Sequence, residues 1–213
     1  MSSQITIEDA VERLAADGFV AYPTETVWGL GASADRPVGI ERLMAWKGRS
    51  TDAPLAVLVS SADEALGLGC RIDAPARRLI EAFWPGPLMV VVPCRRRFAA
   101  GVARGDGALG LRCSSHPLAR ALAAAAHGAG LGPLTSTSLN LAGETPAADA
   151  ESAAAMIGDG SSEGLRSPLL VSTMGHDAGG AAPSSVVDCT AELPKIIRVG
   201  AIDRESLEEF WSH

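Results

Sequence analysis

The chain has 213 residues, of which 18 are Lys or Arg and 25 are Asp or Glu, and its formal net charge is −7. Hydrophobic residues make up 47% and charged residues 20%, which is ordinary for a globular protein and excludes disordered and collagen-like chains. The acidic balance argues against a protein that coats nucleic acid, although a few local cations suffice to bind a small anion. We expect one domain over residues 1–213, with its core at about 5–202 and a C-terminal helix at 203–211.

Targeting signals and metal motifs are not recognisable in the sequence. The apolar runs are strand-sized and fall short of the ~20 residues that a membrane-spanning helix needs. Residues 1–14 contain Glu8, Asp9 and Glu12 and lack the apolar core of a signal peptide. The four widely spaced cysteines form no Cys-x-x-Cys pair, which favours reduced thiols over a zinc site or a disulfide framework. We therefore expect a cytoplasmic protein with no membrane partner and no metal bound by its own side chains.

Hydrophobic periodicity predicts helices that alternate with short strands. In chain order it predicts a helix from a capping box at residues 6–9 to Gly18, a strand over 19–22, a helix over 37–46, a strand over 55–59, helices over 61–66 and 74–83, strands over 88–92 and 110–113, a helix over 117–127, a strand over 134–137, a helix over 149–157, and strands over 169–172, 185–189 and 196–199. This alternation indicates an α/β fold with a central sheet. No long helix separates the last three strands, so we expect part of the sheet to be antiparallel.

Residues 22–31, YPTETVWGLG, gather hydroxyls, a carboxylate and glycines directly after a predicted strand. Thr24 and Thr26 can donate to a carboxylate or a phosphate, and the glycines let the backbone approach a ligand. The segment matches neither a Walker A loop nor a dinucleotide fingerprint. Taken alone, a tight structural turn is the simpler explanation.

Cations and hydroxyls also cluster at the predicted ends of helices and strands. Lys47 and Arg49 flank a glycine, where they can hold a phosphate or carboxylate, or simply complement the helix dipole. Residues 135–140, TSTSLN, follow a strand, where α/β sheets usually bind ligands, although a hydrogen-bonded turn is the alternative. Other candidates of this kind are Arg112, His116, Ser184 and Arg198. This inventory suits the binding of a nucleotide and a small zwitterion better than acid/base hydrolysis.

Taken together, these segments resemble the YrdC/Sua5 family of threonylcarbamoyl-adenylate synthases. The resemblance spans roughly residues 5–202 and rests on segments in the family's order: YPTETVWGLG at 22–31, KGR at 47–49, FWPGPL at 83–88, GLR at 110–112, HP at 116–117, STSLN at 136–140, SSVVD at 184–188 and IRVGA at 197–201. Each segment alone is weak. The combination of Lys-x-Arg, Trp-Pro-Gly-Pro and Ser-x-Asn in this order is specific.

The resemblance implies a single-domain α/β fold in which a twisted, mixed sheet with flanking helices encloses a large groove. It implies that L-threonine, bicarbonate and ATP, with Mg²⁺ carried by ATP, give threonylcarbamoyl-AMP and pyrophosphate. A separate transferase complex would then modify an adenosine of tRNA. The two alternatives are an RNA-binding protein of the same fold, which the net charge of −7 disfavours, and a related carbamoyl-adenylating enzyme with another carbamate source.

The resemblance also assigns roles position by position. It implies that Lys47 and Arg49 are catalytic. The residues implied for L-threonine binding are Thr24, His116, Ser136 and Ser184. The residues implied for ATP binding are Lys47, Thr51, Arg112, Ser138, Asn140 and Arg198. The chain departs from the usual family pattern at Trp28, Ser50, Leu139 and the region around 172–177, and the last of these departures concerns the loop over the site.

Overall fold

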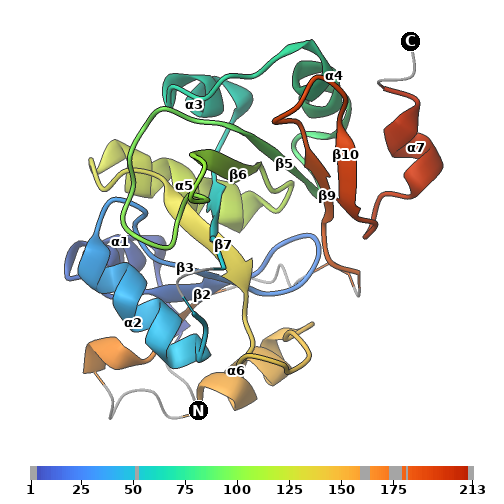
Figure 1. Cartoon of the computed structure of the whole chain (residues 1–213). Helices are drawn as coiled ribbons and strands as arrows, with labels where there is room; N and C mark the ends of the chain where they lie inside the picture. The colour runs from blue at the N-terminus through green and yellow to red at the C-terminus, as the bar shows by residue number, and fades with distance from the viewer. Residues whose placement is uncertain (1–3, 51–52, 159–163, 173–178, 181, 211–213) are drawn as a thin grey trace.

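The computed structural model describes residues 4–50, 53–158, 164–172, 179–180 and 182–210 (Figure 1). Its helices are α1 (Ile7–Ala15), α2 (Pro37–Lys47), α3 (Ala62–Gly67), α4 (Ala74–Phe83), α5 (Pro117–Gly128), α6 (Ala150–Ile157) and α7 (Arg204–Glu208). They coincide with the predicted helices to within a few residues, because local signals mark their starts. Thr6 and Asp9 form the predicted capping box at α1, and Asp149 and Asp203 cap α6 and α7 through their side chains.

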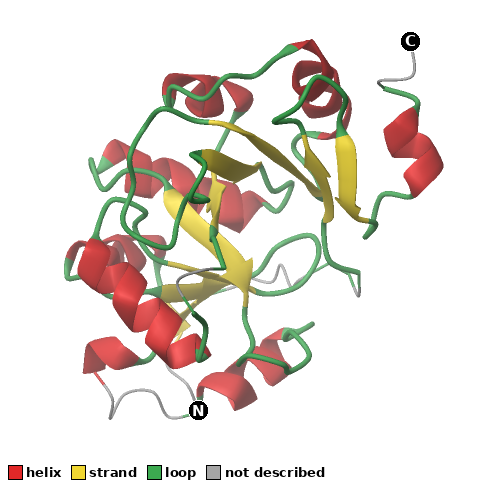
Figure 2. Ribbon diagram, in the orientation of Figure 1, coloured by secondary structure: helices red, strands yellow, loops and turns green. Residues whose placement is uncertain are grey.

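The strands form a mixed ten-stranded sheet in the order β1-β8-β2-β3-β7-β4-β6-β5-β9-β10 (Figure 2). They are β1 (Gln4–Ile5), β2 (Val20–Tyr22), β3 (Gly29–Gly31), β4 (Ala56–Leu58), β5 (Leu88–Pro93), β6 (Ala108–Arg112), β7 (Leu134–Ser138), β8 (Leu169–Val171), β9 (Ser185–Asp188) and β10 (Lys195–Arg198). β8 runs parallel to β1 and β2, β4 parallel to β6 and β5 parallel to β9, whereas the remaining pairs are antiparallel. The predicted α/β fold and its partly antiparallel sheet are therefore confirmed.

Two strands were not predicted, and β3 is the more informative of them. β3 pairs with β2 and β7, and its two glycines face bulky neighbours across the sheet. A Cβ atom on Gly29 would lie 2.7 Å from Cε2 of Tyr22, and one on Gly31 would lie 2.5 Å from the carbonyl oxygen of Thr135. The glycines thus allow close packing inside the sheet. Their lack of β propensity is the reason that this segment resembles a turn in the sequence.

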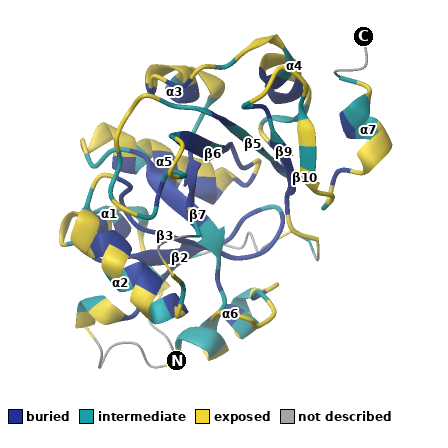
Figure 3. Cartoon of the chain, in the orientation of Figure 1, coloured by how far each residue is buried: buried dark blue, intermediate teal, exposed yellow. Residues whose placement is uncertain are grey.

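The central strands of the sheet are mostly buried (Figure 3). Their side chains belong to two hydrophobic cores on opposite faces. Along β2 and the residue before it, Phe19 and Ala21 belong to the larger core, and Val20 and Tyr22 belong to the smaller one, as the alternation of an extended chain requires. α2, α3, α4, α6 and α7 contribute to the larger core, whereas α1 and α5 form the smaller core with β2, β4, β7 and β8. No helix among the described residues is long and apolar enough to cross a membrane.

Candidate functional site

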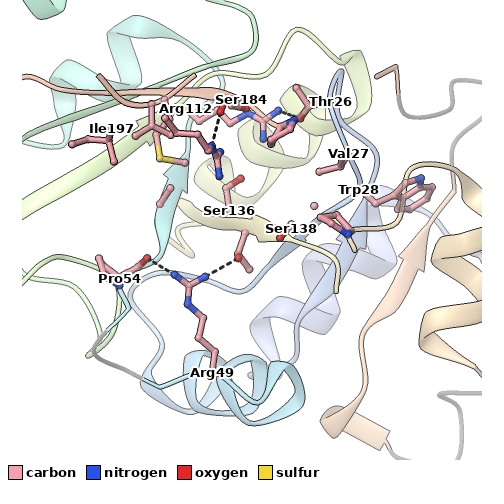
Figure 4. Close-up of a pocket in the computed structure, with 18 residues that line it drawn as sticks. Thr26, Val27, Trp28, Arg49, Pro54, Arg112, Ser136, Ser138, Ser184 and Ile197 are labelled. Atoms are coloured by element: carbon pink, nitrogen blue, oxygen red, sulfur yellow. Dashed lines mark hydrogen bonds between the residues drawn. The ribbon is translucent and has the colours of Figure 1, made fainter. Parts of the chain in front are cut away.

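A cavity of about 510 Å³ with many polar side chains in its lining lies over one face of the sheet (Figure 4). Its polar lining comes from Thr26, Arg49, Arg112, Ser136, Thr137, Ser138, Ser184 and Arg198. Apolar lining comes from residues such as Val27, Met89, Val186 and Ile197. The lining residues reach across contiguous strands from β3 to β10, so the cavity is built by the sheet rather than by one loop.

Strand periodicity explains why the cavity lies where it does. Leu134 on β7 and Leu58 on β4 pack in the smaller core beneath α1 and α5. Two and four residues along β7, Ser136 and Ser138 face the same side of the sheet and line the cavity, as does Ala56 on β4. The helices therefore cover one end of this face, and the cavity occupies the remainder. The prediction of a groove enclosed by the sheet is confirmed in this form.

Arg112 stands at the centre of a buried polar network on one wall. Its Nη2 atom donates to Glu25 Oε1 at 2.9 Å, to Thr26 Oγ1 at 2.7 Å and to Thr24 Oγ1 at 3.1 Å. Ser114 donates to the second carboxylate oxygen of Glu25. Burial pushes the pKa of Glu25 upward, but the Arg112 charge and the hydrogen bonds from Ser114 and Arg112 outweigh it and hold that pKa below its usual value. Nε of Arg112 is buried without a partner among the described residues.

Lys47 lies at the C-terminal end of α2 and is buried beside the cavity rather than in its lining. Its Nζ atom donates to the carbonyl oxygens of Ser138 at 2.6 Å and Asn140 at 2.9 Å, and to Asn140 Oδ1 at 2.7 Å. Ser138 Oγ donates to the same Oδ1 at 2.6 Å. Burial, reinforced by the charge of Arg49, lowers the pKa of Lys47 to about 8. The Lys-x-Arg and Ser-x-Asn segments thus meet through this one ammonium group.

Arg49, which follows α2, and Arg198, at the end of β10, both line the cavity. Arg49 Nη1 donates to Thr137 Oγ1 at 3.2 Å and Nη2 to the Pro54 carbonyl at 3.1 Å, as the dashed lines in Figure 4 show. Arg198 Nε donates to the Ser184 carbonyl at 3.0 Å. Among the described residues neither guanidinium has an acidic partner at ion-pair distance. Burial lowers the pKa of both, and the neighbouring Arg112 charge contributes at Arg198. Such a cluster of cations is suited to an anion with several charges.

Two adjacent serines, Ser184 and Ser185, differ in the hydrogen bonding of their side-chain hydroxyls. Ser184 Oγ is buried without a partner among the described residues, and Ser184 lines the cavity. Ser185 Oγ instead donates to the Ile202 carbonyl at 2.6 Å and accepts from the amides of Gly200 and Ile202. An unpaired buried hydroxyl is costly, which makes Ser184 a good candidate to bind a ligand.

Other predicted site residues lie outside this lining. Thr24 is buried, and its hydroxyl donates to the Val27 carbonyl at 2.6 Å, so it braces the turn beside Arg112. His116 is the N-cap of α5, where Nδ1 accepts from the Leu118 amide at 3.2 Å. Asn140 is engaged with Lys47 and with the Leu141 and Glu144 carbonyls. Thr51 falls outside the described residues, as do 173–178.

Several residues of the site were not among the predicted ones. Glu25 orients Arg112, and its signal was its place inside the YPTETVWGLG segment; Thr26, which the sequence suggests as a donor to an anion but which has no predicted site role, accepts a hydrogen bond from Arg112. Met89 pairs in register with Arg112 and with Val186, which places it on the cavity face. Only strand register identifies such apolar residues. Trp28 and Leu139, two departures from the family pattern, are fully buried in the larger core.

The comparisons with known proteins agree with this geometry. The Sua5/YciO/YrdC family model, described as telomere recombination, matches residues 12–200. A putative threonylcarbamoyl-AMP synthase of Mycobacterium tuberculosis is 34% identical over 206 residues, covering 95% of this chain and 88% of that protein. The threonylcarbamoyl-AMP synthase of Bacillus subtilis is 32% identical over 203 residues, covering 95% of this chain and 55% of that protein.

Solved structures give the same fold. The crystal structure of P. abyssi Sua5 complexed with L-threonine superposes with a TM-score of 0.83 at 27% identity, covering 97% of this chain but only 57% of that one. E. coli YciO shares the fold, with a TM-score of 0.76 at 22% identity, and covers 95% of this chain and 98% of that one. The match of the family model over most of the chain, the identities above 30% and these superpositions agree, and the chain belongs to the Sua5/YciO/YrdC family.

Proposed function

We propose that this protein is an L-threonylcarbamoyladenylate synthase, a nucleotidyltransferase that converts L-threonine, bicarbonate and ATP into threonylcarbamoyl-AMP and pyrophosphate. The observation that carries the proposal is the cavity of about 510 Å³ in which Arg49, Arg112 and Arg198 meet serine and threonine hydroxyls. The names of the relatives, and the L-threonine complex of P. abyssi Sua5, support the choice of substrates.

The chemistry fits a site of this composition. The neutral amine of threonine attacks bicarbonate, forming a C–N bond and releasing water, and the product is a carbamate. A carbamate oxygen then attacks the α-phosphorus of ATP, and the bond from that phosphorus to the bridging oxygen breaks, so that pyrophosphate leaves. Such a transfer needs positioning and stabilisation of negative charge more than a strong side-chain base. Guanidinium groups and hydroxyls supply both.

The proposed roles follow from position. Arg49 and Arg198, which have no acidic partner among the described residues, hold the phosphates. Ser184 and Ser136 bind threonine, with Thr24 bracing that wall. Lys47 and Asn140 fix the end of β7 and so place Ser138 for the nucleotide. We retain Lys47 as a catalytic residue in the proposal, since a phosphate that enters the site can compete for its ammonium hydrogens. The binding of L-threonine by His116 and the binding of ATP by Thr51 stay predictions.

We expect Mg²⁺ to arrive with ATP and to stay on its phosphates. The described residues contain no group of three or more His, Cys, Asp or Glu side chains that could hold a metal ion. The reaction would take place in the cytoplasm, and its product would pass to a separate complex that modifies tRNA. We do not expect direct tRNA binding, because the net charge is −7.

The test is pyrophosphate release from MgATP by the purified protein, measured with and without threonine and bicarbonate. Release that needs both, with threonylcarbamoyl-AMP found by mass spectrometry, supports the proposal. Release that carbamoyl phosphate supports in place of the two substrates would favour a different carbamoyl-adenylating enzyme. Salt-dependent tRNA binding without ATP turnover would instead favour an RNA-binding protein.

A further inference from the structure

Two of the four cysteines pair across a β-bridge and line a hollow that shares no lining residue with the proposed active site. Cys70 and Cys94 are partners in an isolated antiparallel bridge between the segment after α3 and the end of β5. The hydrogen bonds that flank the bridge join the Arg71 amide to the Pro93 carbonyl at 2.8 Å and the Arg95 amide to the Gly69 carbonyl at 3.5 Å. The two cysteines therefore form a non-hydrogen-bonded pair, the closer of the two antiparallel pair types, with Cα atoms ~4.5 Å apart. That spacing lies within the range that disulfides span.

The side chains point toward one another as well. The Cys70 thiol is near enough to Cys94 for the two to influence each other electrostatically, and the Cys94 thiol donates to the Leu68 carbonyl oxygen at 3.6 Å. Cys70 is buried, whereas Cys94 is half-exposed. Burial, together with the neighbouring Cys94 thiol, raises the pKa of Cys70. Cys94 is thus the sulfur that reagents reach first, and Cys70 is placed behind it to resolve a mixed disulfide.

Solvent reaches the pair through a surface hollow. Both cysteines line it together with Arg71, Arg95 and Asp106, and Asp106 is paired with Arg104 at 2.5 Å. Arg71, which is paired with Asp73 at 3.0 Å, and Arg95 place positive charge at this hollow, and such charge attracts a reagent that carries carboxylates. Glutathione disulfide is a reagent of that class.

We propose that Cys70 and Cys94 are a modification site, where exchange with a low-molecular-weight, carboxylate-bearing disulfide forms a reversible intramolecular disulfide. The Cys94 thiolate attacks one sulfur of the reagent, whose S–S bond breaks and releases one thiolate. The Cys70 thiolate then attacks the Cys94 sulfur and releases the second. The protein loses two electrons and two protons, and the reagent is reduced to two thiols. The bond would tie the end of β5 to the segment after α3 and stabilise the fold.

The experiment incubates the fully reduced full-length protein with oxidised glutathione, blocks remaining thiols by alkylation and measures the intact mass and the peptide map. We expect a loss of two hydrogen masses, one cross-linked pair of peptides that contain Cys70 and Cys94, and reversal by dithiothreitol. The oxidised form should melt several degrees higher than the reduced form, because the closed loop restricts the unfolded chain. Pyrophosphate release should be unchanged, so failure here is distinct from failure of the proposed function.

Matched variants complete the design. Cys94→Ser should abolish the cross-link, whereas Cys113→Ser and Cys189→Ser, which alter the other two buried thiols, should leave it intact. The peptide map of the oxidised wild-type protein tests the proposal even if a variant folds poorly. A stable glutathione adduct on Cys94 with Cys70 still open to alkylation would overturn the proposal. So would a cross-link through Cys113 or Cys189, or no reaction at all.

Discussion

Arg112 and Glu25, 87 positions apart in the chain, form an ion pair of 2.9 Å on the wall of the cavity, and their side chains are only 8% and 15% exposed. The carboxylate anchors the Nη2 atom of Arg112, while the arginine lines the cavity. Arg112 is therefore oriented before any ligand arrives, which is the arrangement that lowers the cost of binding an anion.

Replacement of Glu25 should show how much this anchor matters. In Glu25→Gln, Ser114 and Arg112 keep a polar partner, but the buried Arg112 charge loses its counterion. We expect the free energy of unfolding to fall by about 2–4 kcal/mol. Asp106→Asn, which removes the carboxylate of a largely exposed pair with Arg104, is the matched control and should cost less than about 1 kcal/mol. Urea denaturation measures both, and equal losses would contradict the anchoring role.

The same pair predicts a dependence of stability on pH. The pKa of Glu25 in the folded protein lies below its ordinary value of 4.5, because the Arg112 charge and hydrogen bonds outweigh the effect of burial. A depressed carboxyl pKa contributes stability that is complete above the unfolded value and is lost as pH falls through the folded value. The stability difference between wild type and Glu25→Gln should therefore be constant from pH 7 to about 5 and shrink below about 4.5. A difference that grows on acidification would refute this sign.

Ser184 and Ser185 offer an internal comparison between a ligand-binding and a structural hydroxyl. Ser185→Ala removes an oxygen with three hydrogen-bond partners, so it should cost about 1–3 kcal/mol of stability. Ser184→Ala removes a buried hydroxyl that has no partner among the described residues, so stability should hold while the KM for threonine rises severalfold. Thermal melts and pyrophosphate kinetics separate the two. If Ser184→Ala is unstable but binds threonine normally, the assigned role is wrong.

Arg49 provides the clearest test of phosphate recognition. Its hydrogen bonds to Thr137 and the Pro54 carbonyl are long, at 3.2 Å and 3.1 Å, so the fold should tolerate Arg49→Ala. The variant should lose on the order of 2–4 kcal/mol of transition-state stabilisation in kcat/KM for ATP. Arg97→Ala, which removes an exposed arginine outside the cavity, controls for the change in net charge and should keep full activity. Near-full turnover by Arg49→Ala would show that Arg49 does not bind the phosphates.

Local signals in the sequence predicted most of the fold. Capping residues at Thr6, Asp149 and Asp203 and continuous apolar runs mark the helices and strands, because those features act over a few neighbouring residues. β3 was not predicted, because its glycines are required by the close approach of Tyr22 and Thr135, which lie on adjacent strands. Close packing between strands has no local signature.

The site was predictable where its residues carry charge or hydroxyls in recognisable segments. Arg49, Arg112, Ser136, Ser138, Ser184 and Arg198 do line one cavity. The sequence could not show that all three hydrogens of Lys47 are engaged with Ser138 and Asn140, nor that Met89 lies beside Arg112. Both facts depend on how distant strands and helix ends meet.

Lys47 yields a final prediction in which activity and stability respond to pH in opposite directions. Burial and the Arg49 charge lower its pKa to about 8 from the ordinary value of 10.5. As pH rises through about 8, the ammonium loses its proton, and its attraction for phosphate weakens, so kcat/KM for ATP should fall. Between about 8 and 10.5 the unfolded chain holds the extra proton, so the contribution of Lys47 to stability should increase with pH.

The Lys47→Met variant distinguishes this group from the titration of threonine or ATP. Pyrophosphate release by the variant should be lower than that of wild type at neutral pH. Its pH profile should lack the decline near pH 8 that we expect for wild type. Urea denaturation of both proteins at pH 7, 8 and 9 should show wild type gaining stability relative to the variant as pH rises. A decline near pH 8 that persists unchanged in Lys47→Met would assign the titration to another group, and a relative loss of wild-type stability would show that the folded pKa is not depressed.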